Sequence, residues 1–194
     1  MKFKYCLALA AVVFGAGCGK EERAEAVRLS KALTQKQPDF ASANAAEKDL
    51  VDNARVFCGA ITANGAGRGQ ELAQNASVVT QLANSAVEIS GHLSQVRQAV
   101  YDLSLKQEYP QSIRATLITE FTKRQRFLQD VRSMLEQSST DFLAYQKLRD
   151  FKGDTFPDGI VKLNAVLESY KPPADAVGTA LAALKTKYNL TGAE

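Results

Sequence analysis

The sequence predicts an all-α protein, an elongated antiparallel bundle in which two long central helices are flanked by shorter ones. Apolar residues recur at alternating steps of three and four along two long stretches, a spacing that gathers them on one face of a helix but not of a strand. The composition agrees, because the chain is rich in Ala, Leu, Gln, Lys and Glu and contains no Trp.

The first residues have the layout of a secretory signal. Lys2 and Lys4 precede an apolar stretch, residues 5–16, that contains no charged residue. A helix that spans a bilayer needs roughly 20 apolar residues, whereas this stretch is soon followed by charged residues that begin at Lys20. We therefore predict that residues 1–17 are a signal peptide and not a permanent span.

The end of this stretch, Ala16-Gly17-Cys18, resembles the lipobox of bacterial lipoproteins, although Gly15 stands where that family has an aliphatic residue. The resemblance covers only the N-terminal part of the chain. It implies that Cys18 receives a diacylglycerol thioether and becomes the new N-terminus. Gly19, in place of Asp, implies sorting to the outer membrane, facing the periplasm. An ordinary cleaved signal is the alternative.

The cysteines give two exclusive readings. Cys6 leaves with the signal, so the exported chain keeps Cys18 and Cys58. If Cys18 is acylated, Cys58 has no partner and is expected to be a small buried apolar residue. If Cys18 is not acylated, an oxidising compartment allows a disulfide between the two.

Residues 18–38 are charged and contain few large apolar residues, so we predict a lipid-anchored tether or a short helix there. Residues 39–194 are predicted to form the helical bundle domain. Its first helix runs from Asp39 to about Asn64 and ends at a glycine-rich turn, residues 65–69. One face of this helix carries a stripe of small and apolar residues: Ala43, Ala46, Leu50, Ala54, Phe57 and Ile61.

Two longer helices follow, from Gln70 to about Lys106 and from about Pro110 to Asp150. At about 1.5 Å per residue, each would be roughly 50 Å long or more. The short link between them favours an antiparallel hairpin. Their seams can pair within one chain or, as in a coiled coil, between two, so a homodimer is an alternative. The seam residues are Val79, Leu82, Ala86, Ile89, Leu93, Val96, Val100 and Leu103, then Leu117, Phe121, Leu128, Val131, Leu135, Phe142 and Tyr145, interrupted by Arg124 and Ser138.

Two shorter helices complete the predicted bundle. Residues 155–158, Thr-Phe-Pro-Asp, form a candidate capping box before a helix that continues to Tyr170. Pro172 and Pro173 stop that helix, and apolar residues at helical spacing from Val177 to Tyr188 mark the last one.

Residues that could carry chemistry are few. His92 is the sole histidine and lies beside the apolar seam. One histidine cannot supply the paired Glu-x-x-His motifs of a di-iron bundle, and no Cys-x-x-Cys-His sequence is present for haem attachment. We therefore expect His92 to be structural or partly exposed, and we predict no catalytic residue, no metal and no cofactor.

Lys123, Arg124 and Arg126 form the densest basic cluster, which could meet an anionic partner or ligand. Because these positions span more than one helical turn, their charges fan around the axis, and a solvated face is the simpler interpretation. The formal net charge of the chain is only +3 and falls when Lys2 and Lys4 are removed, which argues against a nucleic-acid binder.

These observations favour a non-enzymatic interaction or scaffold protein of the bacterial cell envelope, held at a membrane by a lipid and bound to an envelope protein. The alternative is a helical bundle that holds a small molecule between its helices near Arg124 or His92. A closed pocket lined by Leu, Phe and Tyr with converging polar groups would distinguish the alternative from an interaction protein.

Overall fold

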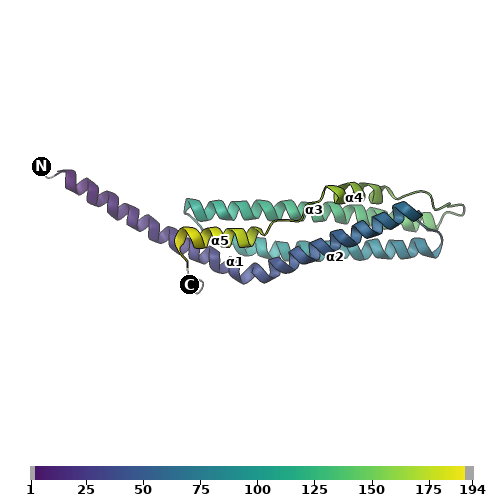
Figure 1. Ribbon diagram of the computed structural model, residues 1–194, viewed down its shortest axis with the longest axis horizontal. Helices are drawn as coiled ribbons and strands as arrows, with labels where there is room; N and C mark the ends of the chain where they lie inside the picture. Colours follow the sequence, from purple (N-terminus) through teal and green to yellow (C-terminus); the bar gives the residue numbers. More distant parts are fainter. Residues whose placement is uncertain (1–2, 191–194) are drawn as a thin grey trace. The chain divides into compact units, whose positions relative to one another are not determined.

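The computed structural model describes the backbone of residues 3–190 and the side chains of residues 19–190. These residues form five α-helices and no β-strand (Figure 1). The helices are α1 (Phe3–Asn64), α2 (Gln70–Tyr101), α3 (Glu108–Gln146), α4 (Asp158–Ser169) and α5 (Ala176–Tyr188). The all-α prediction is confirmed, with α2 and α3 as the long central helices and α4 and α5 as short flanking ones.

The chain divides into two compact units. Unit 1 contains Met1–Pro38, Val96–Glu120 and Asp175–Glu194, and unit 2 contains Asp39–Gln95 and Phe121–Ala174. Helices α1, α2 and α3 each contribute residues to both units, whereas α4 belongs to unit 2 and α5 to unit 1.

Within unit 2, α2 and α3 are antiparallel neighbours. The hydroxyl groups of Thr80 and Ser139 are 3.0 Å apart, and Gln125 Nε2 donates to the carbonyl oxygen of Ser90 over 3.3 Å. Later residues of α2 therefore lie beside earlier residues of α3, as the short link between the helices predicted.

Helix α1 runs parallel to α3 in unit 2. The ring centroids of Phe40 and Phe121 are 5.5 Å apart, and those of Phe57 and Phe142 are 6.3 Å apart. The guanidinium of Arg55 donates to the carbonyl oxygen of Leu167 near the end of α4. The start of α4, at Gly159, lies against Met134 and Ser138, and Tyr170 at its end stacks on Phe127, so α4 is antiparallel to α3. Successive helices in unit 2 thus alternate in direction, as in an up-down-up-down bundle.

The predicted apolar seams form the core. Among their members, Val79, Ala86, Ile89, Leu93, Val96, Val100, Leu117, Phe121, Leu128, Val131, Leu135 and Phe142 are buried. Arg124 and Ser138, the two polar residues that interrupt the second seam, are buried as well. The Ser138 hydroxyl donates to the carbonyl oxygen of Met134 one turn earlier, a bond that satisfies the hydroxyl inside its own helix.

The expected boundary near residue 38 is not a helix end, because α1 continues through Pro38. Pro38 has no N–H to bond the carbonyl of Thr34. The segment before it nevertheless packs in unit 1, where the side chains of Ala26, Leu29 and Leu33 are buried. Burial of these side chains stabilises a packed helix where the charged sequence had suggested a tether or a short helix.

The predicted capping box before α4 is wrong. The N-cap residue is Pro157, and no side chain caps this helix end. Instead, the N–H groups of Ile160 and Val161 donate to the carbonyl oxygen of Pro157.

The loop between α1 and α2 is the glycine-rich turn that the sequence predicted. Gly65, Gly67 and Gly69 in this loop all have positive φ angles, which favour glycine.

Candidate functional site

A buried cluster of charged and polar side chains joins three helices of unit 2. Arg124 on α3 and Glu47 on α1 are only 5% and 1% exposed. Arg124 Nε and Nη2 donate to Glu47 Oε2 over 2.9 and 2.6 Å. Tyr170, at the end of α4, donates its hydroxyl proton to Glu47 Oε1 over 3.0 Å. We call these three residues the Glu47 cluster.

Aromatic rings and burial complete the environment of the Glu47 cluster. The Arg124 guanidinium carbon lies 5.1 Å from the ring centroid of Phe40, a cation–π arrangement. Burial raises the pKa of Tyr170, and so do the negative charge of Glu47 and the hydrogen bond to it. The tyrosine therefore stays protonated and continues to donate to Glu47 at any physiological pH.

Two buried polar atoms near this cluster have no hydrogen-bond partner among the described residues, Arg124 Nη1 and Asn44 Oδ1. A buried polar atom without a partner lowers stability. Arg124 Nη1 therefore lacks the compensation that the hydrogen bonds to Glu47 give Nε and Nη2.

The predicted interaction residues are not brought together. Lys123, Arg126 and His92 are exposed, whereas Arg124 is buried against Glu47. The basic residues of α3 therefore fan around the helix axis, and only the one that faces the core has a buried partner. These positions do not supply the converging polar groups that the ligand-binding alternative requires.

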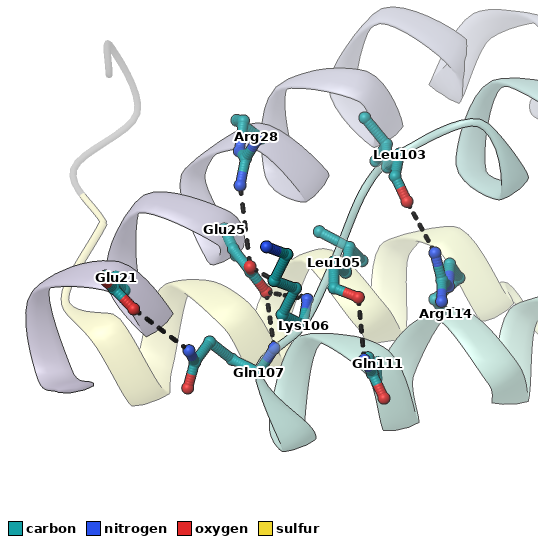
Figure 2. A network of polar contacts seen from close by, with 9 residues as sticks. All are labelled: Glu21, Glu25, Arg28, Leu103, Leu105, Lys106, Gln107, Gln111 and Arg114. Atoms are coloured by element: carbon teal, nitrogen blue, oxygen red, sulfur yellow. Dashed lines mark hydrogen bonds and ion pairs between the residues drawn. The ribbon is translucent and has the colours of Figure 1, made fainter.

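A second polar network lies in unit 1 and holds the start of α3 (Figure 2). Glu25 on α1 is 5% exposed. Its carboxylate accepts the backbone N–H groups of Lys106 and Gln107, each over 2.9 Å. Arg28 Nη2 is 3.8 Å from Glu25 Oε1. Glu25 lies on α1 but accepts the N–H groups just before α3. It therefore caps the start of α3 as an N-cap side chain would.

Opposing effects act on the Glu25 carboxyl. Burial alone would raise its pKa, but the hydrogen bonds from the Gln107 and Lys106 backbones and the charges of Arg28 and Lys106 outweigh burial and lower the pKa. Glu25 is therefore ionised at neutral pH, and its charge is matched by donors on the α2–α3 loop.

This loop also explains why α2 ends at Tyr101, earlier than the predicted end near Lys106. Arg114 donates to the carbonyl oxygen of Leu103 over 2.6 Å, and Gln111 donates to that of Leu105 over 2.8 Å (Figure 2). Side chains of α3 thus satisfy carbonyl groups that would otherwise continue the helix.

Helix α5 is joined to the same end of α1. Tyr188 donates its hydroxyl proton to Glu22 Oε1 over 2.8 Å, and Lys187 Nζ lies 3.5 Å from the ring centroid of Tyr109 on α3. Burial raises the pKa of Tyr188, and the hydrogen bond to Glu22 and its charge raise it further. The first turns of α1 after Cys18 are therefore fixed to both α3 and α5.

Two surface hollows accompany these networks. One, of about 360 Å³, is lined in unit 1 by Glu21, Glu25, Arg28, Lys106 and neighbouring residues. The other, of about 320 Å³, lies in unit 2 beside Met134, Gly159 and Lys162. Both are open to solvent, and their walls carry charged side chains. They differ from the closed apolar pocket expected for a ligand held between helices.

The structure describes the side chain of only one of the two cysteines that the predicted cleavage would retain. Cys58 is free and fully buried, as expected for a small apolar core residue, and burial raises the pKa of its thiol to about 11. The side chains of residues 1–18 lie outside the described residues, so lipidation of Cys18 and cleavage before it stay predictions. Within the described part of the chain, no helix is long and apolar enough to cross a membrane.

The fold and its networks define a class, an all-α bundle whose buried charges join its helices. Among the described residues, no group of three His, Cys, Asp or Glu side chains is placed to hold a metal ion. Comparison with protein-family models, curated proteins and solved structures gives no match.

Proposed function

We propose that this chain is a bacterial lipoprotein of the cell envelope that acts as a non-enzymatic interaction protein. The observation that carries the proposal is the sequence Ala16-Gly17-Cys18 at the end of an uncharged apolar stretch. The lipid on Cys18 confines the helical body to a membrane surface, with the outer membrane, facing the periplasm, as the favoured location. Confinement raises its effective concentration for a neighbouring envelope protein.

The packing of α1 supports a cleavage site before Cys18. Cleavage there keeps Glu22 and Glu25, which bind α5 and the start of α3, and it keeps the buried residues from Ala26 onward. The mature chain therefore retains the contacts that fix α1 in unit 1. The packed part of α1 begins within a few residues of Cys18, so only a very short linker separates the lipid from the folded protein.

The proposal of a non-enzymatic role is supported by the contacts of the buried charged side chains, which are made to other parts of the fold. Glu25, Glu47 and Arg124 each bind groups on other helices or on the loop before α3. These contacts give each buried charge a structural role in joining the helices. We propose that the exposed helix faces contact the partner.

The test begins with the mass of the protein purified from bacterial membranes. We expect the N-terminal peptide to begin at Cys18 and to carry a diacylglycerol thioether, and we expect the protein in the membrane fraction. The Cys18→Ser variant should move to the soluble fraction. The matched control, Cys58→Ala, changes the buried cysteine and should stay in the membrane fraction.

Crosslinking in intact cells then tests the interaction role. The wild-type protein should crosslink to a reproducible envelope neighbour, and Cys18→Ser should lose most of that crosslink. An unmodified Cys18 together with a freely soluble wild-type protein would remove the proposal.

A further inference from the structure

The hollow beside Glu25 lies close in sequence to the proposed lipid. Its first lining residue, Glu21, is three positions after Cys18. At about 1.5 Å per residue, the helical rise from Cys18 to Glu21 is roughly 5 Å. The headgroup layer of a bilayer leaflet is about 5–8 Å thick. A diacylglycerol chain on Cys18 therefore places this end of α1 at the level of the phospholipid headgroups.

The walls of the hollow carry both signs of charge. Arg28 and Lys106 are exposed and extend toward Glu25 from α1 and from the α2–α3 loop (Figure 2). Both oxygens of Glu25 already accept backbone N–H groups. Glu21 is also exposed, and its only described contact is a 3.5 Å hydrogen bond from Gln107 Nε2. Two cations and one carboxylate thus remain accessible to a ligand.

We propose that this hollow binds the headgroup of a zwitterionic phospholipid in the membrane that holds the anchor, an assignment that rests on the proposed lipidation of Cys18. The lipid phosphate lies against Arg28 and Lys106, and the lipid ammonium lies against Glu21. A volume of about 360 Å³ accommodates one such headgroup. The bound headgroup orients unit 1 on the membrane surface, which a flexible acyl chain alone does not do.

The charge pattern favours this ligand over an anionic one. An anionic headgroup offers nothing to the exposed carboxylate of Glu21 and is repelled by it. The two cations attract the phosphate of either kind of headgroup, but only a zwitterionic headgroup also brings an ammonium group to the carboxylate of Glu21.

The experiment uses the full-length protein, expressed and processed in bacteria, then reconstituted in vesicles of phosphatidylethanolamine and phosphatidylcholine. The mass of the Cys18 peptide records lipidation. The rate at which an amine-reactive reagent modifies Lys106, relative to the exposed Lys147 of unit 2, records occupation of the hollow. We expect this relative rate to fall severalfold compared with Cys18→Ser protein mixed with the same vesicles.

Arg28→Gln should restore most of the reactivity of Lys106, since it removes one of the two cations. Arg149→Gln, which removes an exposed arginine of unit 2, is the matched control and should leave Lys106 protected. Vesicles of an uncharged glycolipid should give no protection. Equal or greater protection in purely anionic vesicles would overturn the assignment of a zwitterionic headgroup.

Two failures are distinguishable. A lipid on Cys18 without protection of Lys106 overturns the headgroup site and leaves the proposed function standing. An unmodified Cys18 overturns the proposed function and the headgroup site with it.

Discussion

At the scale of single residues, the Glu47 cluster is the strongest polar feature of unit 2. Arg124 interrupts an apolar seam, and its basic cluster was expected to form a solvated face, but the structure buries Arg124. The partner of this charge is not visible in the sequence, because Glu47 lies on another helix 77 positions away. Only the packing of α1 on α3 brings the two side chains within hydrogen-bond distance.

Replacing only Arg124 or only Glu47 should lower the free energy of unfolding more than replacing both. We expect Arg124→Met to lower the free energy of unfolding by about 3–5 kcal/mol, because it leaves Glu47 buried without its cation. The double variant Glu47→Leu/Arg124→Met should recover much of that loss. Urea unfolding of the single and double variants measures both values.

Arg126, an exposed residue two positions from Arg124, provides the control for the Glu47 and Arg124 variants. Arg126→Met, on the same helix, should change the free energy of unfolding by less than about 0.5 kcal/mol. Purely additive effects of the two core substitutions would show that Arg124 and Glu47 do not act as a pair.

At the scale of helices, side chains of α3 bind the backbone just after the end of α2, and Glu25 on α1 binds the backbone where α3 begins. The periodicity of apolar residues predicts both helices but extends α2 too far. Leu103 fits the repeat, yet its carbonyl group is bound by Arg114. Glu25, far from α3 in sequence, binds the N–H groups before that helix. Local patterns do not contain this information.

The Glu25 contact should make the stability of unit 1 depend on pH. The pKa of Glu25 is lowered in the folded protein, so the ionised carboxylate stabilises the fold above the pKa of the unfolded chain, and the stabilisation is lost as the pH falls through the lowered folded pKa. We expect Glu25→Gln to be less stable than wild type at pH 7, with the difference shrinking toward pH 3. Thermal unfolding across this range is the measurement. A constant difference would contradict the role of the charge.

The approach of α4 to α3 depends on a glycine. A Cβ atom at Gly159 would collide with the Met134 carbonyl oxygen and the Ser138 hydroxyl. We expect Gly159→Ala to destabilise the protein by about 1–3 kcal/mol in urea unfolding, because α4 must shift away from α3.

Another helical glycine is the matched control. Gly91 is exposed on α2, and a Cβ atom there would meet nothing within 4 Å. Gly91→Ala should therefore stabilise the protein by about 0.4–1 kcal/mol. Equal effects of the two substitutions would show that Gly159 is not needed for close packing.

At the scale of the whole molecule, α1 is shared by the two compact units, and Pro38 is the last residue of its unit 1 segment. Proline within a helix removes one backbone hydrogen bond. The charged composition before Pro38, with its few large apolar residues, predicted a tether or a short helix. Burial of Leu29 and Leu33 in unit 1 overrides that local preference.

Pro38→Ala tests this account. The substitution restores an N–H that can bond the carbonyl of Thr34, so we expect the free energy of unfolding to rise by roughly 1–3 kcal/mol. Thermal unfolding monitored by circular dichroism gives the change. Destabilisation would instead show that the missing hydrogen bond at Pro38 is required by the fold.

The sequence by itself determined the all-α class, the two long central helices and most of the buried residues, because apolar periodicity is a local property that the chain carries at every turn. It also supplied the candidate lipid site at Cys18. The tertiary structure alone decided which polar residues meet, including the pairing of Glu47 with Arg124 and the binding of Glu25 before α3. These contacts join residues far apart in the chain, and no short-range pattern specifies which helix faces will lie side by side.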